Sequence, residues 1–186
     1  MRSGARLLPP RAAGAANPGA NPRAGGDAGL ANPAAMRDVR LVAAAVGVDP
    51  EFGARLATYW RDLGVEPPPA WHLQYLRRLS TENGRSRYAF WGESAGARVG
   101  LAILRLEADW MWPERRVGHI AEFTVFQPWR RRGVGRALAR ACRDWLRAQG
   151  CGAVELDVLP GNARAHAFWQ AMGGDAICVR MRLPLH

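Results

Sequence analysis

Three consecutive arginines followed by alternating glycines form the heptapeptide Arg-Arg-Arg-Gly-Val-Gly-Arg at residues 130–136. An apolar run at 119–126 precedes it and predicts a strand, and an amphipathic helix is expected to begin at Gly133. The first N–H groups of a helix lack partners and carry about half a positive charge. A strand, an Arg-Gly turn and a helix N-terminus can therefore hold a phosphate group.

The helix is predicted over residues 133–149, because apolar residues recur at spacings of three, four and seven while arginines occupy the other face. Gly150 is expected to end it with a left-handed residue. Gly133 and Gly135 remove side chains where a ligand or the preceding strand must come close. A plain strand-to-helix connection with solvated arginines is the commoner explanation of such a cluster, so the motif alone does not decide between the two.

The turn resembles the acetyl-CoA loop of the GNAT family of N-acetyltransferases, whose pattern is Gln/Arg-x-x-Gly-x-Gly/Ala. Arg130, Gly133 and Gly135 match it between a strand and a long helix. A second family feature follows at the expected distance, a strand at 153–159 and then a helix with the residues Asn162, Ala165, Phe168, Trp169 and Gly173. The resemblance covers residues 117–185 clearly, is weaker from Met36 onward and does not include the first 35 residues.

The resemblance implies that acetyl-CoA is the acyl donor and that an amine attacks its thioester directly. It also implies that the strand backbone binds the pantetheine arm as an added strand, with one N–H polarising the thioester carbonyl. Asn162 is equally suited to cap the following helix, and both roles are compatible. The residues expected to bind acetyl-CoA are Phe123, Thr124, Val125, Arg130, Arg131, Arg132, Gly133, Val134, Gly135, Arg136, Asn162 and Trp169.

Glu122 is the candidate catalytic residue. A primary amine with a pKa of about 10.4 holds its proton at neutral pH, so a base is useful, and the family often places a carboxylate here that acts through water. The alternative is an acid that pairs with one of the many arginines. Where the family often has Tyr, this chain has Trp169, whose N–H cannot deliver a proton. A catalytically silent acyl-CoA-binding module of the same fold is therefore the alternative function.

The chain of 186 residues suits one domain. Residues 1–35 consist mainly of Ala, Gly, Pro, Asn and Arg, and such a segment cannot bury enough apolar surface to offset the entropy of ordering it. We expect it to be a disordered, low-complexity segment and residues 36–186 to form the N-acetyltransferase domain. Met36 directly precedes the globular pattern and is a second candidate for the start of translation.

The net charge of +10 raises the question of a polyanionic partner. All 26 basic residues are arginine, which a GC-rich coding sequence would produce, and the dense cluster at 130–132 is already explained by a pyrophosphate. Nucleic-acid binding is therefore disfavoured. No stretch approaches the ~18 apolar residues of a membrane span, so we expect no membrane association and a cytoplasmic location. We also expect a monomer or homodimer.

Three cysteines, Cys142, Cys151 and Cys178, are expected to be buried thiols, because an odd number without Cys-x-x-Cys spacing suggests neither a disulfide framework nor a zinc site. No two of the four histidines stand at ligand spacing, so no metal is expected. The acceptor is left open. An acidic and aromatic loop could hold a cationic amine by charge and cation–π contact, or could be an ordinary exposed loop, and it contains Glu107, Asp109, Trp110, Trp112 and Glu114.

Apolar periodicity predicts the order β-α-α-β-β-β-α-β-α-β. The elements other than those above are strands at 39–43, 88–91 and 99–106, helices at 50–63 and 71–79, and a final strand at 176–183 that completes the sheet. The expected fold class is α/β, with a mixed, splayed central sheet and helices on both faces, as in the GNAT-like acyl-CoA N-acyltransferase fold.

Overall fold

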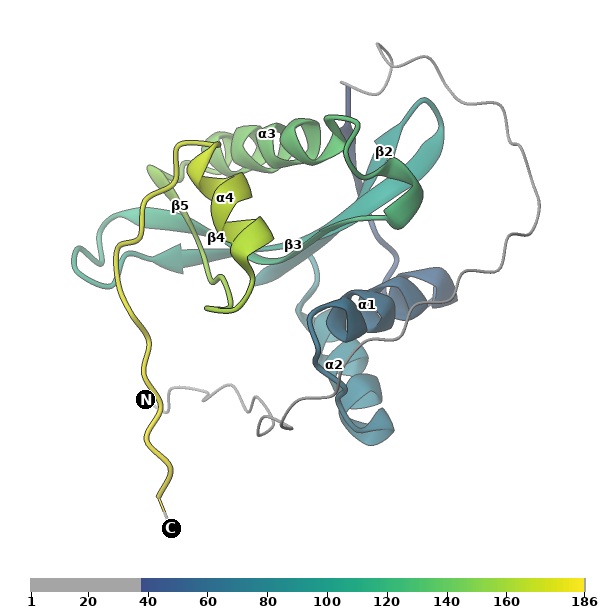
Figure 1. The fold of residues 1–186 in the computed structure, drawn as a ribbon, viewed down its shortest axis with the longest axis horizontal. Coiled ribbons are helices and arrows are strands. Elements are labelled where there is room, and N and C mark those ends of the chain that lie inside the picture. Colours follow the sequence, from purple (N-terminus) through teal and green to yellow (C-terminus); the bar gives the residue numbers. More distant parts are fainter. Residues whose placement is uncertain (1–37, 186) are drawn as a thin grey trace.

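A five-stranded sheet forms the centre of the molecule in the computed structural model, which describes residues 38–185 (Figure 1). The strands lie in sequence order, β1 to β4 are antiparallel, and β5 runs parallel to β4. Their bounds are β1 Arg40–Ala43, β2 Arg87–Ser94, β3 Ala97–Ala108, β4 Arg116–Val125 and β5 Ala153–Leu156. The disordered segment predicted for residues 1–35 and the suggested start at Met36 lie outside the described residues.

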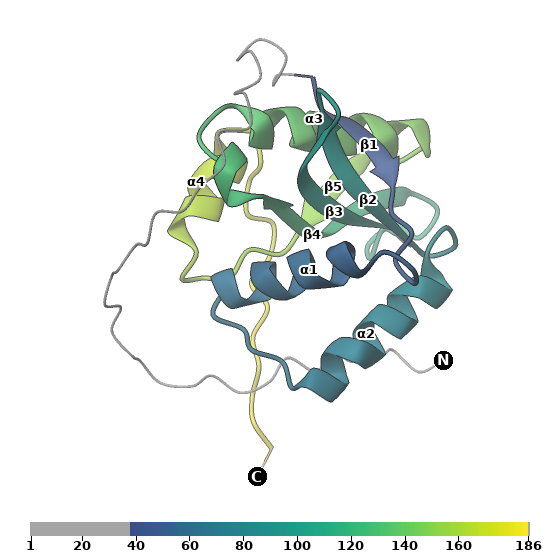
Figure 2. The ribbon, with the colours of Figure 1, turned by 90° about the vertical axis from the view of Figure 1, so that its right-hand side faces the viewer.

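Helices cover both faces of this sheet. Helices α1 (Pro50–Asp62) and α2 (Pro69–Glu82) lie on one face, and α3 (Val134–Ala148) lies on the other (Figure 2). The short helix α4 (Ala163–Gln170) lies near the start of α3 and the end of β4 (Figure 2). The predicted fold class, a mixed open sheet between helices, is confirmed. Among the helices of residues 38–185, none has the length and apolar character that a membrane crossing requires.

The alternation of β3 connects the two layers of the core. Leu101 and Ile103 pack under α1 and α2, whereas Ala102 and Leu104 pack under α3, and all four are fully buried. Successive side chains of a strand point to opposite faces, so the covered middle of this strand must be apolar on both sides. Helix α3 approaches so closely that a Cβ on Gly118 of β4 would lie 2.6 Å from the Leu146 side chain. Glycine at this position therefore allows the helix to pack directly on the strand.

The final strand predicted at 176–183 does not form. These residues have no regular secondary structure, and the alternating side chains from Ile177 to Leu185 are 67 to 97% exposed. Arg180 contacts Asp157 at 3.4 Å, but the segment runs on past the sheet instead of along β5 (Figure 1). Alternation shows that a segment could be a strand, but a strand also needs a neighbouring edge to pair with. Here β5 has only four residues.

The cysteine prediction is correct only in part. Cys142, a residue of α3, is fully buried, and burial raises the pKa of its thiol to about 12. Cys151 is half-buried, whereas Cys178 is exposed because it lies in the segment that does not join the sheet. The expectation of three buried thiols is therefore wrong for Cys178.

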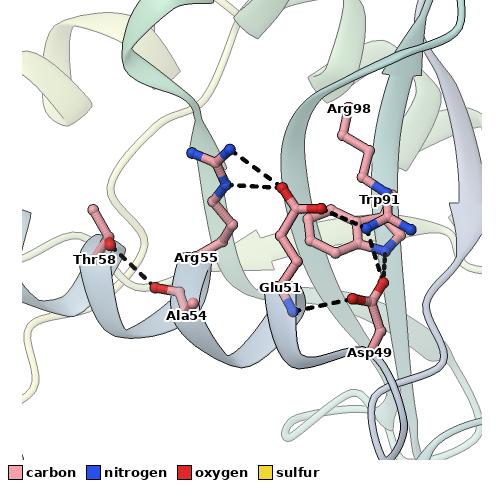
Figure 3. Close-up of polar contacts among 7 residues, drawn as sticks. All are labelled: Asp49, Glu51, Ala54, Arg55, Thr58, Trp91 and Arg98. Carbon is pink, nitrogen blue, oxygen red and sulfur yellow. Dashed lines mark hydrogen bonds and ion pairs between the residues drawn. The ribbon is translucent and has the colours of Figure 1, made fainter.

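A polar network fixes the start of α1 to the sheet (Figure 3). The Asp49 carboxylate caps the helix by accepting a hydrogen bond from the Glu51 N–H at 3.1 Å. It also accepts one from the indole N–H of Trp91 on β2 at 3.2 Å and pairs with Arg98 of β3 at 2.9 Å. Arg98 pairs in addition with Glu51 at 2.7 Å. One carboxylate thus joins the helix to two strands.

Replacing Asp49 by Ala should lower the free energy of unfolding by about 2–3 kcal/mol, because it removes a helix cap and leaves the buried Trp91 N–H without this acceptor. Asp49→Asn keeps a capping oxygen and should lose less. Asp144 pairs with Arg147 where both side chains are two-thirds exposed, so Asp144→Ala should cost under about 0.5 kcal/mol and serves as the control. Urea unfolding measures all three variants, and equal losses for Asp49→Ala and Asp144→Ala would contradict this account.

Candidate active site

A β-bulge in β4 determines which side of the sheet each candidate residue faces. Ile103 of β3 lies opposite Glu122, but the next residue, Leu104, lies opposite Ile120, so Ala121 is the extra residue. Partners across a ladder share a face. Glu122 therefore faces α1 and α2 with Ile103, whereas Ile120 faces α3 with Leu104.

Two tyrosines from the helices on that face contact Glu122. The Tyr75 hydroxyl of α2 lies 3.3 Å from the Oε1 atom of Glu122. The Tyr59 hydroxyl of α1 lies close to the Glu122 carboxylate and to the Phe123 N–H. Burial, together with the adjacent Glu122 charge, raises the pKa of Tyr59 well above its usual range. The hydroxyl therefore stays protonated and remains a donor.

The sheet opens beside the end of β4 (Figure 1). Strand β5 pairs with β4 only from Val117 to Ile120, yet β4 continues to Val125, and no strand within residues 38–185 pairs with residues 121–125 on that side. The Phe126 N–H bonds to Val99 of β3, and the Val125 carbonyl accepts from Arg130 instead of β3. Because the groups of a strand alternate in direction, the Val125 N–H points to the opening and the Thr124 N–H to β3. An extended ligand could add here as a strand.

The Arg-Gly turn follows at the end of this opening. A short 3-10 helix (Gln127–Trp129) leads into it, and α3 begins at Val134 after Gly133, which adopts a left-handed φ of +83°. No side chain caps the first turn of α3, and a Cβ on Gly133 would have no atom within 4 Å. The helix N-terminus is therefore open to an anion, as the sequence predicted.

The arginines of the turn differ in their partners. Arg130 donates to the Val125 carbonyl at 2.7 Å and pairs with Asp62 at the end of α1 at 2.6 Å, so it ties the turn to the strand and to the helix. Arg136 reaches the Ala171 carbonyl after α4 at 3.4 Å. Arg131 and Arg132 are exposed beside the helix N-terminus. These two are the better placed for a phosphate, whereas Arg130 has a structural role.

Helix α4 places Asn162 and Trp169 next to the same elements. The Asn162 side chain accepts a hydrogen bond from the Ala165 N–H at 3.0 Å, so its capping role is confirmed. The Trp169 and Phe168 rings lie 5.1 and 5.9 Å from that of Phe123, and a Cβ on Gly135 would lie 3.4 Å from Phe168. The structure therefore brings together the strand, the glycine turn and the last helix that the sequence proposed for one site.

The acidic and aromatic loop lies elsewhere. It joins β3 to β4 at the end opposite the Arg-Gly turn, and Arg116 lies about 20 Å from Glu122 along the strand at about 3.3 Å per residue. The Asp109 carboxylate is occupied by the N–H groups of Met111 and Trp112, and Trp112 contacts Arg115. Within this structure the loop is an exposed turn and not a wall of the site.

The sequence profile of the Acetyltransferase (GNAT) family matches residues 42–173, which include every element of this site. The chain belongs to the GNAT acetyltransferase family. An aminoglycoside N(6')-acetyltransferase type 1 of Stenotrophomonas maltophilia is 34% identical over 94 residues, and this match spans 48% of the chain and 61% of that enzyme. The predicted family is confirmed over most of the described residues.

Solved acetyltransferase structures share the fold. A ribosomal-protein-alanine N-acetyltransferase from Brucella melitensis is similar with a TM-score of 0.64 at 18% identity, covering 79% of this chain and 99% of that one. The enzyme AAC(6')-Iy, in complex with a bisubstrate analogue of CoA and acetylneamine, has a TM-score of 0.58 at 20% identity and coverages of 78% and 98%. At such identities the likeness establishes the GNAT fold.

The tyrosines that contact Glu122 were not among the site residues predicted from the sequence. Tyr59 lies on the apolar side of α1, and Tyr75 lies on the inner side of α2, where it packs against Trp60 and Trp71. A buried tyrosine hydroxyl usually has a hydrogen-bond partner, so these residues carried a signal that a polar group lies opposite. Only the packing of α1 and α2 on the bulged strand identifies Glu122 as that group.

Replacing Arg130 by Ala and replacing Arg132 by Ala should change the free energy of unfolding by different amounts. Loss of the Arg130 bonds to Val125 and Asp62 should lower the free energy of unfolding by about 1–2 kcal/mol, since both groups are only half-buried. The exposed Arg132 should cost under about 0.5 kcal/mol. Chemical denaturation checks this, and a loss at Arg132 equal to that at Arg130 would contradict the structural role.

Proposed function

We propose that this protein is an acetyl-CoA-dependent N-acetyltransferase that transfers the acetyl group directly to an amine. The observation that carries the proposal is the opening beside the end of β4. The uncapped N-terminus of α3 lies at one end of this opening, and the Glu122 carboxylate, which Tyr75 contacts, belongs to the same part of the strand. Membership of the GNAT family supports acetyl-CoA as the donor. Arg131, Arg132 and the N–H groups of residues 133–136 would hold the pyrophosphate, and the strand end would hold the pantetheine arm.

Starting from its ammonium form, the acceptor nitrogen loses two protons and the CoA sulfur gains one. Glu122 would accept the first proton, directly or through water, and the free amine would then attack the thioester carbonyl. The second proton would pass from the nitrogen to water as the C–S bond breaks and the amide forms. The Val125 N–H points into the opening and is the donor that we assign to the developing oxyanion. CoA thiolate, with a thiol pKa of about 8.5, is a tolerable leaving group and can take its proton from water. Trp169, packed on Phe123, would orient and shield the thioester.

An aminoglycoside is the first acceptor to test, because the curated relative acts on that class. The ribosomal-protein-alanine enzyme among the structural relatives makes a protein N-terminus the second. Release of free thiol from acetyl-CoA across a panel of both kinds of amine measures turnover. Binding of acetyl-CoA without thiol release from any amine would favour the catalytically silent module.

Acetyl-CoA should raise the melting temperature of the protein, and Gly133→Glu should remove this effect by placing a negative charge at the phosphate site. Gly133→Asn is the matched control, because asparagine tolerates the left-handed φ of this residue and adds no charge. The asparagine variant should keep most of the thermal shift. Equal shifts in a folded glutamate variant and the parent would exclude the turn as the phosphate site.

Glu122→Gln should lower kcat/KM by about 10²–10⁴-fold at neutral pH and remove the acidic limb of its pH profile, because the amide cannot accept a proton. Trp169→Phe keeps an aromatic ring against Phe123 and should retain most activity, since water supplies the proton to sulfur. Steady-state thiol release from pH 6 to 9 tests both variants. A Glu122→Gln profile equal to that of the parent, or an inactive Trp169→Phe that still binds acetyl-CoA, would refute the role concerned.

A further inference from the structure

Two hydroxyl groups from separate helices converge on Glu122. Tyr75 contributes its hydroxyl from α2 at 3.3 Å from Oε1, and Tyr59 contributes its hydroxyl from α1. The two helices are connected to each other by rings, since Trp60 of α1 lies 5.0 Å from the Tyr75 ring at a steep angle. The carboxylate is thus held from two directions.

The Tyr75 ring is itself held in place. Tyr75 stacks on Trp71 with centroids 5.3 Å apart, and Trp71 in turn lies 5.1 Å from Trp60, which is only 5% exposed. Such aromatic packing leaves a ring few alternative positions. The position of the Tyr75 hydroxyl is therefore fixed before any ligand arrives, which is the condition for orienting a reacting group.

We propose that Tyr59 and Tyr75 are positioning residues that hold the Glu122 carboxylate, charged and oriented, at the point where the acceptor amine loses its proton. This inference rests on the proposed function and adds two residues to it. A tyrosine hydroxyl donates a hydrogen bond but adds no positive charge, unlike an arginine. It therefore holds the carboxylate without placing a cation where a cationic amine must arrive.

Tyr59 also couples Glu122 to the strand backbone. Its hydroxyl lies beside the Glu122 carboxylate and also beside the N–H of the next residue, Phe123. The Thr124 N–H points to β3, so the Val125 N–H is the group that remains for the ligand.

Other charged and titratable groups also lie around the cluster. The Arg87 guanidinium of β2 lies 5.9 Å from the centre of the Tyr75 ring and pairs with Glu82 of α2. His72 of α2 contacts Trp60, and burial lowers the pKa of its imidazole. Asp62 at the end of α1 pairs with Arg130. Comparison with Glu122→Gln identifies which titration belongs to Glu122.

The first test is a titration that does not require activity. The Glu122 side-chain carboxyl is followed by 13C NMR in the full-length chain and is assigned by its loss in Glu122→Gln. Tyr59→Phe and Tyr75→Phe should each raise the titration midpoint by about half to one pH unit, because a donated hydrogen bond favours the charged form. Tyr88→Phe is the control, since that hydroxyl donates to the Arg85 carbonyl in the turn leading to β2. Midpoints unchanged in both variants would overturn the inference.

The second test is the pH profile of thiol release with an active acceptor. In each tyrosine variant the acidic limb of kcat/KM should move to higher pH by the same amount, activity should recover toward pH 9, and the thermal shift by acetyl-CoA should stay unchanged. In the Glu122→Gln background the same replacements should leave the profile unaltered. A uniform loss at every pH, or an unmoved limb, would overturn the positioning role. Absence of thiol release by the parent would instead contradict the proposed function and leave the NMR result to decide the hydrogen bonds.

Discussion

The extra residue Ala121 in β4 is the constraint on which the site depends. In a regular strand Glu122 would share a face with Ile120 and would lie under α3. The bulge instead turns Glu122 toward α1 and α2, while Phe123 faces α3 and α4. Two neighbouring residues thus serve opposite sides of the sheet. A donor held along the strand and an amine arriving from the side of α1 and α2 can meet at one point.

The end of pairing between β4 and β5 is the second part of the same arrangement. Parallel pairing stops at Ile120 and Leu156, and β4 then continues alone to Val125. The freed strand edge and the N-terminus of α3 both present N–H groups, so they suit carbonyl and phosphate oxygens. Arg130 fixes their relative position, because it bonds to the last residue of the strand and to α1. Arg130 therefore has a structural role, and the exposed Arg131 and Arg132 beside it remain available to an anion.

Electrostatics separate the two halves of the site. The turn concentrates positive charge, which would compete for the Glu122 carboxylate if both lay on one face. The aromatic cluster of α1 and α2 lies around Glu122 instead and supplies neutral donors. The fold is shared with acetyltransferases whose names specify an aminoglycoside and a ribosomal protein. The fold alone therefore does not select the acceptor.

Local pattern was sufficient for much of this molecule. Some features depend on interactions within a few residues, so periodicity and turn chemistry predict them: the apolar stripe of α3, Gly133 before it and the Asn162 cap of α4. The spacing of the motifs also correctly predicted the family. Tertiary structure decided the rest. The strand expected at 176–183 has the right alternation of apolar side chains but no strand edge beside it to pair with. The side of the sheet that Glu122 faces depends on a register shift between β3 and β4, which cannot be predicted from the sequence of one strand. The partners of Tyr59 and Arg130 are likewise distant in sequence, because pairing and packing between elements, and not the order of residues within one, bring such groups together.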